Sequence, residues 1–303
     1  MPGITAFAIF KELKQPVSIS DLKVMLGLDH STISLVVSSL AEEGFVQKKR
    51  DGKKVFVTRA NTLHARSLEE FLKEYPRLPV EEMFSYSSLE ILSSLTCSHT
   101  ITDIAAMTGL NRHTVSTAIS KLSRYGIILK EKGRFVLNKR HRKAADFVSS
   151  YWRYMANHRL SDITGDGIIL WQRGREFLFK IQTDLEYTNR SHIQPTATTV
   201  FSQYDLGIMT GTRYYFHTRR ELSVDDHIIH TILIDPLNPI INSYAVALAM
   251  QSGAKDLLNT GRRYDMEKHI ASLLEYLRIQ EKNSDSVLQW NEYMDIFNSL
   301  VVR

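Results

Sequence analysis

Two stretches of the chain carry hydrogen-bonding side chains and cations at the start of a predicted helix and along one of its faces. Hydroxyl, imidazole and guanidinium groups in that arrangement can contact base edges and phosphates in a DNA groove. Arg112 is the best candidate for a guanine contact, because its guanidinium can donate to O6 and N7 together. The candidate contact residues are His30, Ser31, Thr32 and Ser34 in the first stretch, and Arg112, His113, Thr114, Ser116 and Lys121 in the second.

Each stretch is followed by a predicted β-hairpin that is rich in lysine and arginine. Residues 45–58 contain an Asp-Gly pair between β-rich arms, which is a strong hairpin signal, and residues 127–137 are a shorter version. Cations on such hairpins are expected to contact phosphates or a minor groove. They are Lys48, Lys49, Arg50, Lys53 and Lys54 in the first hairpin, and Lys130, Lys132 and Arg134 in the second.

The two stretches belong to an internal repeat with an offset of 82 residues and no gap. The identical pairs include Ile19/Ile101, Asp21/Asp103, Met25/Met107, Gly27/Gly109, Leu28/Leu110, Thr32/Thr114, Ser34/Ser116, Ser38/Ser120, Leu40/Leu122 and Gly44/Gly126. A repeat of this length indicates that one supersecondary unit occurs twice.

Each copy predicts two helices joined by a tight turn. A hydroxyl or carboxamide group can cap a helix start, and a glycine can adopt the left-handed conformation at a helix end. The expected caps are Ser20, Gly27 and Asp29 in the first copy, and Thr102, Gly109 and Asn111 in the second. The second helix of each copy has an apolar face, formed by Ile33, Val36, Val37 and Leu40 or by Val115, Ala118, Ile119 and Leu122.

One more helix is predicted before each pair, at residues 4–14 and 86–95. The order helix, helix, helix and basic hairpin resembles the winged helices of MarR- and ArsR-like archaeal and bacterial regulators. The resemblance covers residues 19–58 and 101–137. It implies a sequence-specific transcriptional regulator whose second helix enters the major groove of double-stranded DNA. A homodimer is expected, because a palindromic site matches two-fold symmetry.

Charge and composition agree with this expectation. The net charge of +5 divides unevenly: residues 1–160 hold 24 Lys+Arg against 15 Asp+Glu, whereas residues 161–303 hold 14 against 18. The basic front part suits a polyanion. Cys97 is the only cysteine, which excludes disulfides within one chain. No stretch is long and apolar enough to span a membrane and no signal peptide is evident, so we expect a cytoplasmic protein.

The predicted fold class is α+β, mainly α with small β elements, in three domains. Residues 1–78 and 79–160 form the two winged helices, and residues 161–303 form an α+β effector or interaction domain. Residues 138–143 form a basic run between the second hairpin and a helix that is rich in aromatic residues. This run is either a solvated helix start or a phosphate-contacting segment, because cations at a helix start oppose the macrodipole unless an anion is near.

The third domain is predicted to begin with a hairpin at residues 168–181, followed by a strand at residues 213–217 and a helix capped by Ser223. Residues 213–231 resemble part of the C-terminal domain of abortive-infection type IV antitoxin regulators, with Asp226 and His230 one helical turn apart. The resemblance implies an antitoxin role, with a toxin as protein partner. The second winged helix departs from that family's simplest layout.

Three histidines of this domain invite a metal interpretation. His227 and His230 are three residues apart on one predicted helix, and His217 is near in the sequence. Pairs at this spacing more often pack with local hydrogen bonds, so no metal and no cofactor is predicted.

No enzyme is predicted either. The chain has no Gly-Ser dipeptide and no Asp-x-Asp, which a nucleotidyltransferase needs, and it has no phosphate-binding glycine loop and no nucleophile elbow. The sequence therefore predicts a DNA-binding regulator. The alternative is a scaffold whose winged helices bind a protein partner without specific DNA binding.

Overall fold

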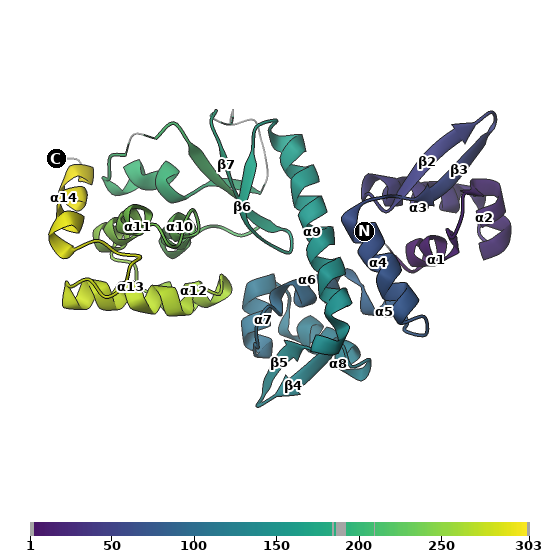
Figure 1. Cartoon of the computed structure of the whole chain (residues 1–303), viewed down its shortest axis with the longest axis horizontal. Helices are drawn as coiled ribbons and strands as arrows, with labels where there is room; N and C mark the ends of the chain where they lie inside the picture. Colours follow the sequence, from purple (N-terminus) through teal and green to yellow (C-terminus); the bar gives the residue numbers. More distant parts are fainter. Residues whose placement is uncertain (1–2, 184, 186–191, 209, 302–303) are drawn as a thin grey trace. The chain divides into compact units, whose positions relative to one another are not determined.

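The computed structural model describes residues 3–183, 185, 192–208 and 210–301. The chain divides into two compact units, Met1–Met155 and Ala156–Arg303 (Figure 1). Helices dominate both units, and the described strands form three small antiparallel sheets. The predicted α+β class, mainly α with small β elements, is confirmed at this level.

The first repeat folds as three helices and a hairpin, followed by a fourth helix. A third, two-residue strand pairs with the hairpin, and the sequence did not predict it. The elements are α1 (Ile4–Glu12), β1 (Val17–Ser18), α2 (Ile19–Leu26), α3 (His30–Glu42), β2 (Val46–Asp51), β3 (Lys54–Arg59) and α4 (Leu63–Glu74).

The second repeat has the same order of three helices and a hairpin, and the four-residue helix α5 precedes them. A single bridge between His99 and Phe135 takes the place of the pairing of Val17 in β1 with Val57. The elements are α5 (Val80–Met83), α6 (Tyr86–Ser94), α7 (Ile101–Thr108), α8 (Arg112–Arg124), β4 (Ile128–Glu131), β5 (Arg134–Leu137) and the 3-10 helix η1 (Lys139–His141).

The predicted C-terminal caps of α2 and α7 are confirmed, whereas the predicted N-terminal caps are wrong. Gly27 and Gly109 end these helices with φ of 64° and 68°. The N-caps are Ser18 and Thr100, two residues before the predicted ones. The reason is the acid three residues later, whose backbone N–H donates to the cap hydroxyl at 3.1 Å in α2 and 3.2 Å in α7.

The core of the first unit runs through both repeats without interruption. Phe84 packs against Phe7 of the first repeat and against Phe147, with ring centroids 6.3 and 4.9 Å apart. Phe147 lies in the first half of α9 (Arg142–Ile163), which also contributes Tyr151 and Trp152 to this core. The shared core holds both repeats within one compact unit.

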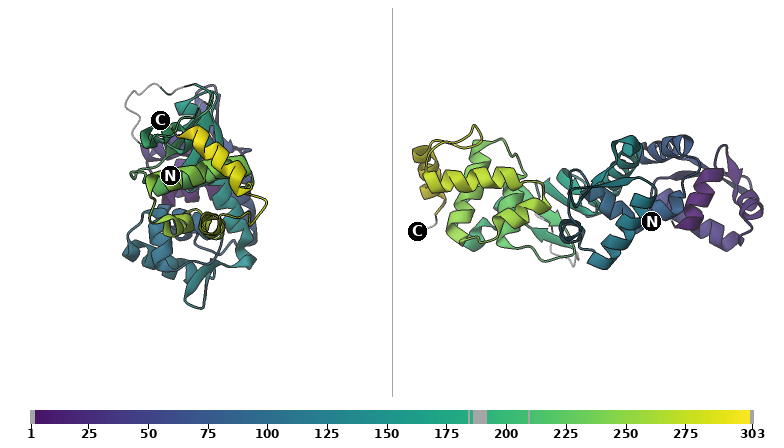
Figure 2. Two further views of the ribbon diagram at one scale, coloured as in Figure 1. Left: turned by 90° about the vertical axis from the view of Figure 1, so that its left-hand side faces the viewer. Right: turned by 90° about the horizontal axis from the view of Figure 1, so that it is seen from below.

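The second unit is built on a four-stranded antiparallel sheet in the order β6-β7-β9-β8 (Figures 1 and 2). Its strands are β6 (Ile168–Arg173), β7 (Glu176–Ile181), β8 (Ile193–Pro195) and β9 (Arg213–His217). Side chains alternate between the two faces of a strand. Tyr215 therefore packs with the second half of α9, whereas Phe216 packs on the opposite face with the helices that follow β9. The predicted hairpin and the strand at residues 213–217 are confirmed, and β8 was not predicted.

A 3-10 helix of this unit lies between β8 and β9 in the sequence, and five described α-helices follow the sheet. Ser223 caps the first of these α-helices, as predicted, with a capping box to Asp226. The elements are the 3-10 helix η2 (Ala197–Tyr204), α10 (Val224–Ile232), α11 (Pro239–Ser252), α12 (Leu257–Arg263), α13 (Glu267–Ile279) and α14 (Trp290–Leu300).

In the described part of the chain, no single helix has the length and apolar character needed to cross a membrane. Only α2 and α3 taken together have them, and these helices are bent by 114° at the turn between them.

Candidate nucleic-acid interface

The apolar spacing of α3 buries one face of the helix and leaves the predicted contact residues on the other. Ile33 and Val37 are fully buried and Leu40 is nearly so. The candidates at the helix start are exposed, and the one further along the helix is half-buried. The exposed candidates are His30, Ser31 and Thr32, and the half-buried one is Ser34.

The hairpin that follows α3 presents its predicted cations to solvent. Asp51 pairs with Lys54, so Gly52 and Lys53 form a two-residue loop at the tip. Lys48 donates a hydrogen bond of 3.3 Å to Ser38 Oγ of α3, which brings a hairpin cation onto the polar side of that helix. All five candidates, Lys48, Lys49, Arg50, Lys53 and Lys54, are exposed.

In the second repeat, α8 presents a matching face. Asn111 caps the helix and accepts a hydrogen bond from the His113 backbone N–H at 2.8 Å, which fixes the direction of the first turn. The buried side is formed by Val115, Ala118, Ile119 and Leu122. Of the predicted contact residues, Arg112, His113 and Thr114 are exposed, and Ser116 and Lys121 are half-buried.

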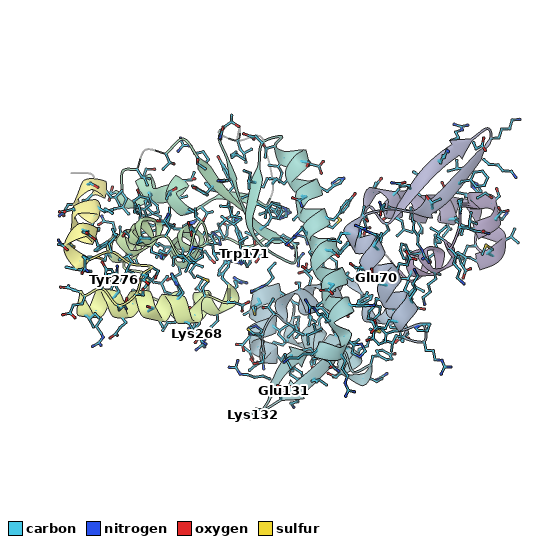
Figure 3. All side chains as sticks on the ribbon, in the orientation of Figure 1. Glu70, Glu131, Lys132, Trp171, Lys268 and Tyr276 are labelled. Atoms are coloured by element: carbon cyan, nitrogen blue, oxygen red, sulfur yellow. The ribbon has the colours of Figure 1, made fainter. Side chains whose placement is uncertain are left out.

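The second hairpin is shorter, and two of its three cations have partners within the protein. Arg134 Nη1 donates to the Ser98 carbonyl at 3.1 Å, and Lys130 Nζ lies 5.8 Å from the centroid of the Phe135 ring. Lys132 is exposed in the loop at the tip, next to Glu131 (Figure 3). This hairpin therefore offers fewer uncommitted cations than the first.

The basic run at residues 138–143 is partly used by the fold. Lys143 forms an ion pair of 2.7 Å with Glu74 of α4, and the His141 ring packs on Tyr75 with centroids 4.7 Å apart. Lys139, Arg140 and Arg142 remain exposed around the start of α9. Both interpretations of the run, a solvated helix start and a phosphate contact, stay predictions.

One exposed residue on α3 was missed. Leu35 is 72% exposed, although the helix buries its other apolar side chains wholly or in part. The signal was available in the sequence, because the 82-residue offset pairs Leu35 with Thr117 on the polar face of α8. Helical spacing also places it beside Ser31 and Ser38.

A buried polar network holds the C-terminal end of α3. Tyr151 of α9 donates to Glu43 Oε2 at 3.0 Å, and Ser39 donates to Glu43 Oε1 at 3.1 Å. His64 Nε2 donates to the Glu43 carbonyl at 2.9 Å, and its ring lies 4.6 Å from the Tyr154 ring. Burial lowers the pKa of His64 to about 4, so the imidazole is neutral at neutral pH and supports the helix as a hydrogen-bond donor.

Of the three histidines considered as metal ligands, His227 and His230 lie close together and His217 lies apart from them. His217 lies on the sheet face with Phe177, where the two rings stack at 4.8 Å, whereas His230 stacks on Phe216 of the opposite face at 4.0 Å. His227 and His230 both bond to the Thr196 hydroxyl, at 2.9 and 2.7 Å. Burial lowers the pKa of His217 and of His227 to about 4.

The second unit also encloses an ion pair that sequence analysis did not identify. Arg220 donates through both terminal nitrogens to the Asp226 carboxylate, each at 2.6 Å. Tyr264 donates to Asp226 at 2.8 Å, and His230 bonds to Tyr264 Oη at 2.8 Å. Burial alone would raise the pKa of Asp226, but the bonds and charge of Arg220 lower it below the usual value. Because Asp226, Tyr264 and His230 are almost wholly buried, this network braces the fold.

No protein-family model matches this chain, and no curated protein matches its sequence. Function must therefore follow from the geometry of the chain's own residues.

Proposed function

We propose that this protein is a sequence-specific DNA-binding regulator whose two repeats are winged helices. The observation that carries the proposal is the duplicated arrangement of a capped helix, exposed at its N-terminal turn, and a basic hairpin. In this proposal α3 and α8 are the recognition helices, and the β2–β3 and β4–β5 hairpins are the wings. The free backbone N–H groups of each first turn favour phosphate or base acceptors.

The first repeat has the stronger electrostatic support. Its wing carries five exposed cations and the second wing carries three. Each wing uses two of its cations in contacts of its own, so the first wing keeps three for DNA and the second keeps Lys132. Exposed lysines give affinity through release of counterions, without regard to sequence. The residues in the first turns of α3 and α8 then discriminate between bases, and the guanidinium of Arg112 is the group that suits guanine.

In this proposal the second unit is the effector or partner domain of the regulator. The regulator is a homodimer, and a protein such as a toxin binds to this unit. Its resemblance to antitoxin regulators supports this role, and so does its excess of acidic residues, which disfavours contact with DNA. A winged-helix scaffold that binds only protein is the alternative that the test below must exclude.

The test is a binding titration of the full chain on the DNA upstream of its own coding sequence and on a scrambled duplex, at two salt concentrations. We expect selective binding to the upstream duplex, with an affinity that falls steeply as salt rises, because each phosphate contact releases counterions. Equal, weak binding to both duplexes would favour the protein scaffold.

Two variants separate the assigned roles within that titration. Arg112→Ala should cost about 1–3 kcal/mol at one base position and relax specificity there. Lys53→Ala, at the tip of the first wing, should weaken binding to all sequences and reduce the salt slope by about 1. An equal loss on every sequence for Arg112→Ala would contradict its role as a base reader.

A further inference from the structure

Leu35 is an apolar side chain on a polar helix face. It lies four residues after Ser31 and three before Ser38, so the three side chains share one side of α3. It is 72% exposed, whereas Ile33 and Val37 on the opposite side are fully buried. The helix is held by its buried side, so Leu35 is presented to solvent from a fixed support. Such a side chain gains free energy only when a partner removes it from water.

We infer that Leu35 recognises thymine in duplex DNA, by packing against the C5-methyl group in the major groove. The inference rests on the proposed function, in which α3 is the recognition helix. Thymine is the only base that presents a methyl group in the major groove, and aliphatic side chains contact that group. The neighbouring serine hydroxyls can bond to base edges or phosphates on either side.

Charge favours DNA over an apolar protein as the partner of this face. Lys48 donates to Ser38 Oγ at 3.3 Å, so a wing cation borders the same side of the helix as Leu35. The rest of the first wing adds four more exposed cations. The exposed acids of α3 and its cap, Asp29 and Glu42, lie at the two ends of the helix rather than beside Leu35. Duplex DNA offers both kinds of contact, because its phosphates pair with the cations and its thymine methyl groups pack against the leucine.

The second repeat has Thr117 at the equivalent position and Arg112 where the first repeat has His30. The two recognition helices therefore differ at two positions of their contact surfaces. Repeat one selects for a thymine methyl group and repeat two for guanine, so the two copies within one chain do not read the same sequence.

The experiment uses the full chain and duplexes that it selects from a random-sequence DNA pool. Each thymine of a selected duplex is replaced in turn by deoxyuridine, which removes only the methyl group. For the wild-type chain, one replacement should reduce affinity roughly fourfold to tenfold. Leu35→Ala should bind the thymine and the deoxyuridine duplex equally well.

Val24→Ala is the matched control, because Val24 is also apolar and 81% exposed but lies on α2; this variant should keep the methyl effect. Insensitivity of the wild type to every replacement overturns the inference and leaves DNA binding intact. A methyl effect that persists in Leu35→Ala also overturns it. So does unchanged DNA binding of that variant, which would point to a protein contact at Leu35. Failure to prefer selected over scrambled duplex refutes the proposed function itself, and the inference with it.

Discussion

His64 shows how one buried residue makes stability depend on pH. Its pKa is lowered to about 4 by burial, from about 6.5 in an unfolded chain. Between these values the unfolded chain binds a proton that the folded chain does not, so stability falls as pH decreases. The loss from His64 is about 2 kcal/mol at pH 5 and is absent above pH 7.

His64→Gln tests this, because glutamine can still donate to the Glu43 carbonyl but does not titrate. Thermal unfolding at pH 7 and pH 5 should show a smaller difference in the variant than in the wild type. His30→Gln, at an exposed position, should leave the difference unchanged. A full pH effect in His64→Gln would show that the destabilisation arises elsewhere.

Burial of single residues could be predicted where spacing alone decides it. The apolar spacing of α8 predicted its buried side, and the exposed first turn followed from it. Helical periodicity does not explain Leu35. It predicts only which apolar residues are buried in the core, and it gives no reason for an apolar residue that is exposed to solvent. The Arg220–Asp226 pair was not predicted because its partners come from a loop, a helix start and Tyr264, which lies 38 residues further on.

At the scale of elements, each repeat has a glycine two residues after the helix that precedes its hairpin, α3 in the first repeat and α8 in the second. Gly44 and Gly126 have φ of 72° and 71°, a backbone conformation that costs other residues about 1–2 kcal/mol. Only the first is crowded. A Cβ at Gly44 would lie 2.6 Å from Tyr154 Oη, whereas at Gly126 the nearest atom is 3.9 Å away.

Gly44→Ala should therefore destabilise the chain more than Gly126→Ala, by roughly 1–3 kcal/mol, because the Tyr154 ring must move away from its contact with His64. Unfolding in denaturant measures both variants, and Gly126→Ala supplies the cost of the backbone conformation alone. Equal losses would mean that Tyr154 moves aside without cost.

Elements defined by local signals could be predicted, and those defined by distant pairing could not. Gly27, Gly109 and Ser223 act as the caps that their residue types suggest. The N-caps of α2 and α7 were misplaced because two hydroxyl residues compete in each copy, and the acid at the third helical position decides between them. The two-residue β1 and the three-residue β8 are too short for a periodic pattern, and only their partners β3 and β9 make them strands.

At the scale of the whole molecule, the cores determine how many parts unfold independently. One hydrophobic cluster extends from Ala6 to Trp152 and includes both repeats, whereas the remaining clusters begin at Ala156. The helix α9 is continuous across this boundary, but its first half belongs to one core and its second half to another. Separate cores favour separate cooperative transitions.

We therefore expect calorimetry of the full chain to resolve two transitions, one for each unit. Gly44→Ala should shift only the transition of residues 1–155. Asp226→Asn should shift only the other, because it removes the charge of the carboxylate that the half-buried Arg220 binds through both terminal nitrogens, a loss of roughly 1.5–3 kcal/mol. A third transition would support division of the first unit near residue 78, into two separately folding repeats. A single transition that both variants shift would show instead that α9 transmits unfolding from one core to the other, and the chain would then respond as one body to whatever its second unit binds.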